Sequence, residues 1–356
     1  MNIKYQQITY QDARAGLQVE NDVYSYANGD LYSCRKNAFL NNPFLKDEST
    51  CMLLLARVDD IVVGKRLFYS TKIKVGEEII DATSGSNYVV HQDYRKYGLG
   101  GAMIMHAAKK KNNFLLSAGC SENSLEIYKA LNAVRVYIPM YRQCKCKVLN
   151  INSTSFRTFC SSSLTSLFNF LLIPFMLVSK IKSKSVTDKF TVLELTAVPQ
   201  WIEDMVLADE HKYMEFHNKD WFEWNLKYNF SGDNDDRQSL FAVKKEGVEV
   251  GFYFIKERKL GSRIVGSLVE WQTSDEGKLS EEEIIMLALS SFSKRVCDIQ
   301  IPTFSESFKR NRFLLGFRAT RPANIVFKDL CKKYPDSSDV NLWRLRMGYA
   351  DVIMSK

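Results

Sequence analysis

The chain has 356 residues, of which 46% are hydrophobic and 25% charged, and its formal net charge is +8. This length favours two domains that each bury a core, and the composition excludes a wholly disordered or fibrous protein. The lysines do not gather with aromatic residues into the kind of stripe that binds single-stranded nucleic acid. We therefore expect no nucleic-acid partner.

Eight cysteines are scattered along the chain, and no two have the C-x-x-C spacing that metal and redox sites favour. We expect no metal. Met1 is not followed by the apolar segment of a secretory signal, so we predict a cytoplasmic protein with reduced thiols.

The first half opens with a strand that leads from Lys4 and Tyr5 into a helix. Residues 53–70 then show two strands around a short polar turn, which is the pattern of a β-hairpin, and the second strand carries Gly64. Residues 85–90 form the end of a further strand.

The most specific motif follows that strand, where residues 95–101 read Arg-Lys-Tyr-Gly-Leu-Gly-Gly and open an amphipathic helix. Glycines at a strand-to-helix junction let several amide N–H groups point at one spot, and the helix dipole adds to the positive potential there. Such a nest of amides binds a diphosphate. We therefore predict that residues 95–101 hold a phosphate-bearing cofactor.

A strand over residues 113–121 and a helix over 122–131 come next, and the helix carries Tyr128. Residues 148–188 then form a linker that is rich in Ser and Thr at its start and in Lys at its end. Its middle, residues 164–178, is almost entirely apolar but too short and too interrupted to span a membrane. We expect a helix buried between domains, with a helix lying on a membrane surface as the alternative.

The second half repeats the order of elements in the first. Residues 297–305 align with 113–121 without a gap, and the hairpin at 240–257 resembles 53–70, with Gly251 in the place of Gly64. Each half reads as an α+β unit with a mixed, mostly antiparallel twisted sheet flanked by helices. An aromatic run at residues 221–224 either lines an acceptor site or belongs to a core.

The second copy lacks the cofactor motif. The alignment places Gly98, Gly100 and Gly101 on Glu282, Ile284 and Ile285, and a carboxylate at that place repels a diphosphate. Tyr128 falls on Arg312. We therefore expect a catalytic, acyl-CoA-binding domain at residues 1–147, the linker at 148–188, and a degenerate accessory or acceptor domain at 189–356.

The segment around residues 95–101 resembles the acetyl-CoA loop of the GNAT superfamily of N-acetyltransferases, in which Arg95, Gly98 and Gly100 fit the pattern. The resemblance covers the element order of residues 1–147 and, more weakly, of 189–356. Asn132 and Ala133 stand where the family usually has Gly-Phe, and Ser121 stands where it has an asparagine.

The resemblance implies a role for individual residues. Tyr128 gives a proton to the departing CoA thiolate, and a backbone N–H near Val89 and Val90 polarises the thioester carbonyl. Ser86 and Asn87 contact the acceptor. His91 is a candidate for the base because it directly follows this strand, and Glu78 and Asp81, a little upstream of the strand, are the alternatives. The cofactor-binding residues implied are Val89, Val90, Arg95, Lys96, Tyr97, Gly98, Leu99, Gly100 and Gly101.

The function expected on this resemblance is direct transfer of an acetyl or related acyl group from acyl-CoA to a small-molecule amine. By analogy with similar tandem enzymes, the acceptor is an amino sugar of surface polysaccharide biosynthesis. Two alternatives stay open: a FemABX-like transferase that uses aminoacyl-tRNA, and a non-catalytic protein that only binds CoA. The sequence leaves the oligomeric state open.

Overall fold

A computed structural model of the protein describes residues 2–17, 38–108, 114–144, 174, 177–228, 236–260 and 263–346. The chain divides into two compact units. Unit 1 comprises Met1–Tyr137, Ala208–Gly232 and Ala323–Ser355, and unit 2 comprises Ile138–Leu207, Asp233–Pro322 and Lys356.

Unit 1 is built on an eight-stranded sheet in which β4 and β5 pair in parallel, while β1 to β4 pair antiparallel in sequence order. A short strand, β9 (Tyr213–Glu215), pairs with the outer end of β3. The other strands, in spatial order, are β1 (Ile3–Thr9), β2 (Cys51–Val58), β3 (Ile61–Val75), β4 (Glu78–Val90), β5 (Phe114–Ala118), β15 (Ala323–Asp329) and β6 (Val134–Ile138).

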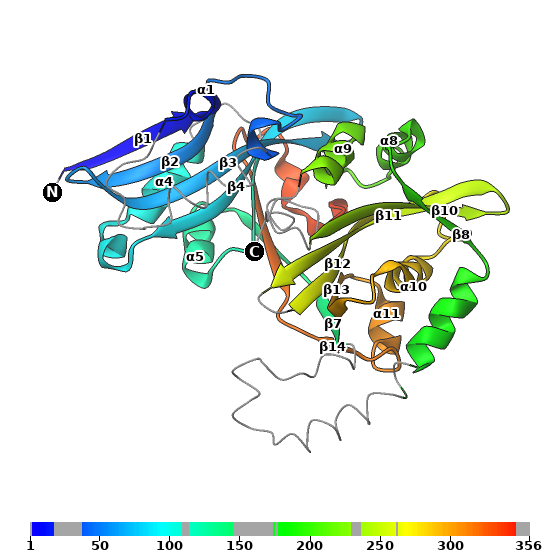
Figure 1. The fold of residues 1–356 in the computed structure, drawn as a ribbon. Coiled ribbons are helices and arrows are strands. Elements are labelled where there is room, and N and C mark those ends of the chain that lie inside the picture. The colour runs from blue at the N-terminus through cyan, green and yellow to red at the C-terminus, as the bar shows by residue number, and fades with distance from the viewer. Residues whose placement is uncertain are drawn as a thin grey trace, which may run out of the picture. The chain divides into compact units, whose positions relative to one another are not determined.

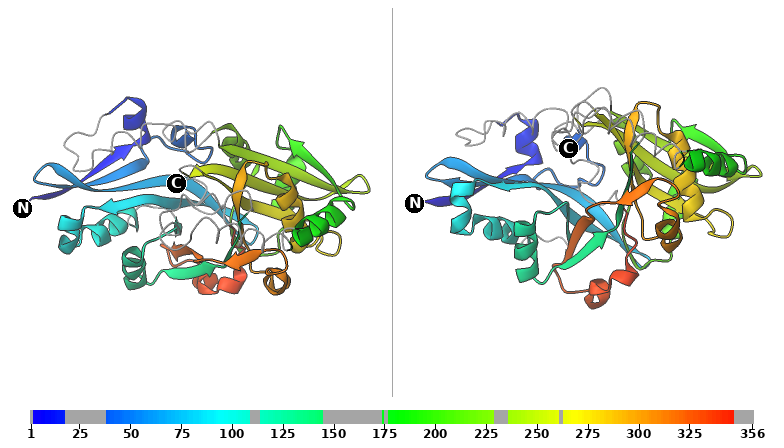
Figure 2. Two further views of the ribbon diagram at one scale, coloured as in Figure 1. Left: turned by 60° about the horizontal axis from the view of Figure 1, so that its bottom comes forward. Right: turned by 90° about the horizontal axis from the view of Figure 1, so that it is seen from below.

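Helices α4 and α5 cover one face of this sheet, and α1 lies on the other face (Figures 1 and 2). The face under α4 and α5 holds a buried apolar cluster that includes Phe68, Leu99, Met103, Leu125 and Tyr128. The helices of unit 1 are α1 (Tyr10–Arg14), the 3-10 helix η1 (Gln92–Tyr97), α4 (Leu99–Ala108), α5 (Glu122–Ala130), α9 (Lys219–Lys227), η3 (Pro335–Ser338) and η4 (Val340–Leu342).

Unit 2 has a seven-stranded sheet whose parallel contact joins β12 and β13. Side chains alternate between faces along a strand, so α10 packs on the face that carries Tyr253, whereas Trp201 of α8 meets Phe252 on the other face. The strands, in spatial order, are β8 (Thr191–Leu195), β10 (Arg237–Lys245), β11 (Val248–Leu260), β12 (Arg263–Thr273), β13 (Val296–Pro302), β7 (Met140–Cys144) and β14 (Phe317–Ala319). Residues 177–187 are helical, and the named helices are α8 (Gln200–Leu207), α10 (Glu281–Ser291) and α11 (Glu306–Asn311).

The predicted α+β class with two mixed sheets flanked by helices is confirmed, and the repeat extends to local irregularities. Gly64 pairs with Ala56 in unit 1 and Gly251 pairs with Val243 in unit 2. A β-bulge lies next to each of these pairs, on the strand that carries the glycine. Bulges alter strand direction at fixed positions, so their recurrence at matched glycines supports duplication.

Each half of the sequence contributes one strand to the sheet formed mainly by the other half. β7 follows the first half of the chain but pairs with β13 and β14 in the second sheet, and β15 from the second half pairs with β5 in the first sheet. The contiguous ranges 1–147 and 189–356 expected from sequence do not include this exchange. The hydrophobic pattern could not predict the exchange of β7 and β15, because an apolar strand has the same pattern whichever sheet it joins.

The aromatic run at residues 221–224 belongs to unit 1, although it lies in the second half of the sequence. Trp221 and Trp224 are buried on α9, and the indole N–H of Trp224 donates to the carbonyl of Ala38 at 2.8 Å. The run is therefore part of a core.

Most of the apolar linker segment, at residues 164–173 and 175–176, lies outside the described residues. No helix in the part that the structure describes is long and apolar enough to cross a membrane.

Candidate active site

β4 separates from β5 partway along its length. The two strands pair in parallel only from Ala82–Phe114 to Gly85–Ser117. β4 continues to Val90 with β3 on its other side. We call this the β4–β5 split, with the Gly85–Ser117 pair at its apex and residues 86–90 of β4 along one side. Backbone groups that a neighbouring strand does not pair are free to bind an extended ligand.

A β-bulge lies just beyond the apex. Lys65 of β3 pairs with Val89, whereas Leu67 pairs with Ser86, so β4 carries one extra residue here. Leu67 and Phe68 lie on opposite faces of the sheet, and they pair with Ser86 and Gly85 respectively. The Ser86 side chain therefore lies on the face opposite to α4 and α5.

The predicted cofactor motif lies at the far end of β4. η1 ends at Gly98, which adopts the left-handed conformation with φ 68° and ψ 12°, and α4 starts immediately afterwards at Leu99. Glycine adopts this conformation without the steric penalty that a β-carbon brings. The first amides of a helix have no intrahelical acceptor, so this junction presents N–H groups together with the positive end of the helix dipole.

Basic side chains accompany this helix start. The Nε of Arg95 donates to the carbonyl of Val90 at 3.0 Å, which ties the loop to the end of β4. Lys96 and Tyr97 are exposed, and the Lys96 ammonium lies 5.2 Å from the Tyr97 ring centroid. Residues 89–101 thus run from the end of β4 through η1 into the start of α4, and their role in cofactor binding stays a prediction.

Gly100 has a packing role that the motif alone does not reveal. A β-carbon at this position would overlap the hydroxyl of Tyr88, which projects from the β4 bulge to the first turn of α4. Burial raises the pKa of Tyr88 to about 12. The sequence pattern gives no indication of this contact, since an alternating strand pattern does not specify how a bulge redirects one side chain.

Tyr128 lies at the apex of the split. Its hydroxyl donates to the Oγ of Ser117 at 2.9 Å, and Ser117 donates in turn to the carbonyl of Gly85 at 3.0 Å. The Arg66 guanidinium donates to the Tyr128 oxygen. Burial raises the pKa of Tyr128, and the nearby Arg66 charge opposes that rise. A neutral phenol held at the point where two strands part can donate a proton to a leaving group there.

His91 lies away from the apex. Its backbone N–H donates to the Val63 carbonyl at 2.8 Å, and its imidazole Nδ1 is 3.7 Å from a carboxylate oxygen of Asp93. It follows Gly85 by six residues on an extended strand, a distance of about 20 Å at ~3.3 Å per residue. His91 is therefore closer to residues 95–101 than to the apex of the split, and its role as base stays a prediction. Asn87, the second predicted acceptor residue, lies in the bulge, and its side chain is outside the described part.

The corresponding helix start in unit 2 is occupied by the chain's own groups. Ser280 and Glu283 form a capping box at the start of α10, in which each side chain accepts from the other residue's backbone N–H. Glu281 and Glu282 accept from Thr303 and Ser307. Three carboxylates in the first turn supply the negative charge that a helix start favours, so this junction has no free positive potential for a phosphate.

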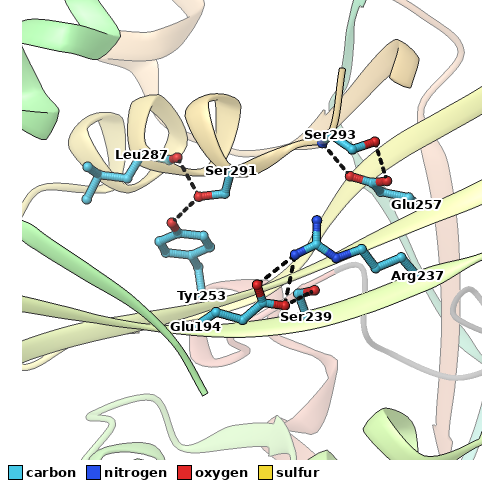
Figure 3. Close-up of polar contacts among 8 residues, drawn as sticks. All are labelled: Glu194, Arg237, Ser239, Tyr253, Glu257, Leu287, Ser291 and Ser293. Atoms are coloured by element: carbon cyan, nitrogen blue, oxygen red, sulfur yellow. Dashed lines mark hydrogen bonds and ion pairs between the residues drawn. The ribbon is translucent and has the colours of Figure 1, made fainter. Parts of the chain in front are cut away.

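Figure 3 shows polar contacts that residues of unit 2 make with one another. The buried Glu257 accepts from both the N–H and the Oγ of Ser293, at 2.6 and 2.7 Å. Arg237 donates to both carboxylate oxygens of Glu194. These carboxylates are therefore already bound by groups of the same unit.

No protein-family model matches the sequence, and no curated protein matches it significantly. Solved structures are similar in fold. A probable N-acyltransferase from Enterococcus faecalis has a TM-score of 0.55 at 9% identity, covering 93% of this chain and 73% of that one. N-myristoyltransferase from Saccharomyces cerevisiae with bound myristoyl-CoA has a TM-score of 0.54 at 12% identity, covering 92% and 82%.

A GCN5-related N-acetyltransferase from Anabaena variabilis has a TM-score of 0.52 at 8% identity, covering 92% of this chain and 73% of that one. Each of these matches extends over both units of the chain. At the level of fold, the resemblance drawn from residues 95–101 is confirmed: the chain has the fold of the GCN5-related N-acetyltransferases.

Proposed function

We propose that the protein transfers an acyl group from acyl-CoA to an amine, and that unit 1 carries the only cofactor site of the described chain. The observation that carries this proposal is the alignment of three features on one strand. β4 runs from the Tyr128 hydroxyl at the apex, along residues 86–90, which pair with β3 but not with β5, to the glycine-opened start of α4. An acyl-CoA has its thioester, its pantetheine arm and its diphosphate in the same order.

The chemistry follows from this order. The amides at the start of α4, with Arg95 and Lys96 nearby, bind the diphosphate. The pantetheine arm pairs with β4 as an added strand, which brings the thioester to the bulge at residues 86–89. The amine attacks the thioester carbonyl, a main-chain N–H of β4 stabilises the oxyanion, and Tyr128 protonates the sulfur as it leaves.

The donor and acceptor form a finer part of the proposal. We place acetyl-CoA first among donors, because the motif at residues 95–101 resembles an acetyl-CoA loop. The yeast N-myristoyltransferase of similar fold binds myristoyl-CoA. Acetyl-CoA and a long-chain acyl-CoA should therefore be compared directly as donors. For the acceptor we place amino sugars first, on the analogy with tandem enzymes of surface polysaccharide synthesis.

Two assays on the full chain test the proposal. Calorimetric titration with CoA should show saturable binding, and thiol release from acetyl-CoA should depend on an added amine. The panel contains amino sugars, amino acids and polyamines, each tested with acetyl-CoA and with a long-chain acyl-CoA. Binding of CoA without turnover across the panel would support a non-catalytic CoA-binding protein. Absence of CoA binding would favour the aminoacyl-tRNA alternative, whose transferases need no CoA loop.

A further inference from the structure

Arg66 is a buried cation without a carboxylate partner among the described residues. It lies on β3, 1% exposed, and its Nε and Nη1 make no hydrogen bond within the part of the chain that the structure describes. Among the described residues, the guanidinium donates one hydrogen bond, from Nη2 to the Tyr128 hydroxyl. The guanidinium otherwise lies among aromatic rings, 5.1 Å from the Phe68 centroid and 5.7 Å from that of Tyr88.

A buried charge of this kind is costly, because the ion loses its hydration and gains no opposite charge in return. Rings offset part of the loss through their negative faces. Such arrangements persist mainly where a negative charge is present or forms during function.

Gly85 provides the room for this guanidinium. A β-carbon on Gly85 would overlap the Nη2 of Arg66 and lie 2.9 Å from its Nε. Gly85 is also the last residue of β4 that pairs with β5. The cation therefore lies directly over the apex of the β4–β5 split.

The hydrogen bonds form one chain with a single direction. Arg66 donates to Tyr128, Tyr128 donates to Ser117, and Ser117 donates to the Gly85 carbonyl. The Tyr128 oxygen is therefore the atom that accepts a hydrogen bond from the positively charged guanidinium. A phenolate at this oxygen would find the cation already in place, without any reorganisation.

The duplicated unit offers a natural comparison. Counting along the strand from the matched glycines, Arg66 corresponds to Tyr253, and Phe68 corresponds to Ile255. Gly85, the partner of Phe68, then corresponds to Leu268, the partner of Ile255. The alignment of residues 113–121 with 297–305 places Ser117 on Ile301, and Tyr128 falls on Arg312.

None of the four groups is retained in unit 2. The Tyr253 hydroxyl instead hydrogen-bonds Ser291 of α10 at 2.6 Å, and Ser291 donates to the Leu287 carbonyl (Figure 3). The buried cation thus occurs in the unit with the glycine-opened α4 and is absent from its copy.

We propose that Arg66 is a positioning residue for acyl transfer, which holds the Tyr128 hydroxyl at the apex and stabilises the phenolate formed when Tyr128 protonates the leaving thiolate. The inference rests on the proposed function. As the amine nitrogen bonds to the carbonyl carbon, the carbon–sulfur bond breaks and sulfur keeps the electron pair. The Tyr128 proton moves to sulfur, and the proton lost by the nitrogen restores the phenol.

The electrostatic surroundings of Tyr128 agree with this role. Burial raises the pKa of Tyr128, while the Arg66 charge, the hydrogen bond to Ser117 and the hydrogen bond from Arg66 lower it. The other titratable groups that act on it are Cys120, which follows β5, and Tyr88 of β4. Of these groups, Arg66 is the one that carries a positive charge.

The test compares Arg66→Met with Arg66→Lys, Tyr128→Phe and the double variant Arg66→Met/Tyr128→Phe. Arg66→Met should lower kcat about 10²-fold, the usual scale for losing acid catalysis, while the CoA affinity stays unchanged in calorimetry. It should also shift the alkaline loss of kcat to higher pH, because the pKa of Tyr128 rises when the cation is removed. Arg66→Lys should recover part of the rate, and the double variant should be no slower than Tyr128→Phe alone.

Arg344→Met is the matched control, since Arg344 is equally buried in unit 1 but faces the Asp209 carboxylate at 3.5 Å. It should lower the melting temperature and leave kcat and its pH profile unchanged. If Arg66→Met fails to fold, Gly85→Ala decides, because it displaces the guanidinium without removing it and should lower kcat likewise.

The inference is overturned if kcat is unchanged in Arg66→Met, or in Gly85→Ala where that variant decides, or if the losses in the double variant multiply. A wild-type protein that fails to bind CoA overturns the proposed function instead, so the two failures are distinct.

Discussion

The hydroxyl of Tyr88 lies where a β-carbon of residue 100 would stand. Glycine at position 100 therefore lets the β4 bulge and the first turn of α4 approach each other, which shapes the proposed phosphate site from the side of the strand. The sequence motif links Gly100 to a flexible backbone, whereas the structure requires glycine at this position because a side chain would not fit.

Gly100→Ala should therefore displace Tyr88 and weaken CoA binding about tenfold, a loss of about 1.4 kcal/mol. In the double variant Tyr88→Phe/Gly100→Ala the overlapping oxygen is gone, so part of the affinity should return. Calorimetric titration of the single and double variants gives the coupling between the two positions. Equal losses with and without the Tyr88 hydroxyl would show that the two residues act independently.

Tyr128→Phe should lower kcat about 10²-fold or more and leave the affinity for CoA unchanged, because the hydroxyl acts on the leaving sulfur and not on the diphosphate. The rate of thiol release at saturating acetyl-CoA measures kcat, and calorimetric titration measures the affinity for CoA. Ser117→Ala removes the acceptor of the Tyr128 proton and the donor to the Gly85 carbonyl but leaves the phenol in place, so it should lower kcat less. A Tyr128→Phe enzyme with full kcat would remove this residue from the mechanism.

Alkaline pH should destabilise unit 1 through Tyr88. Its pKa is raised to about 12 by burial, against an ordinary value of 10.0. Between these values the unfolded chain loses the proton while the folded chain keeps it, so the free energy of unfolding falls as pH rises from about 10 to about 12. In urea titrations at pH 9 and pH 11, Tyr88→Phe should show a smaller fall than the wild type. An identical fall in both proteins would contradict the buried position of this phenol.

Gly98 should tolerate asparagine better than alanine. Its φ of 68° lies in the left-handed region, where a β-carbon costs about 1–2 kcal/mol and Asn is tolerated more often than other residues. Denaturant unfolding should therefore rank the wild type above Gly98→Asn and Gly98→Asn above Gly98→Ala. Equal stabilities of all three would mean that the turn before α4 adopts another conformation in solution.

The strand exchange predicts that residues 1–147 cannot fold alone. This fragment lacks β15, β9 and α9, so β5 would have an open edge and the indole-bearing helix that packs in unit 1 would be missing. We expect an aggregating or unfolded fragment by circular dichroism, and recovery on co-expression with residues 189–356. A stable monomeric fragment that binds CoA would contradict the observed pairing.

The sequence was sufficient for those parts of the molecule that local chemistry specifies. Glycine spacing at residues 98–101 predicted the strand-to-helix junction, and the matched glycines 64 and 251 predicted the duplication. The exchange of β7 and β15 could not be predicted, since strand partners are chosen by tertiary packing and not by the strand's own pattern.

The same limit applies to the candidate site. Tyr128 was identified because the helix motif around it resembles a known one, whereas Arg66 and Ser117 carry no motif and meet Tyr128 only through the fold. One signal was available for Arg66: a charged pair, Lys65-Arg66, interrupts the mostly apolar first part of its strand, residues 61–69. Charges within a core strand are rare unless they are paired or functional.

The central claim is that unit 1 binds one acyl-CoA at the start of α4. Titration of the full chain with CoA tests it most directly, with Gly100→Glu as the site variant and Gly277→Glu as the control. Gly277 is an exposed glycine in the turn before α10, the corresponding helix of unit 2. The account predicts one site per chain, abolished by Gly100→Glu and retained in Gly277→Glu. No binding by the wild type, or unchanged binding by Gly100→Glu, would contradict it.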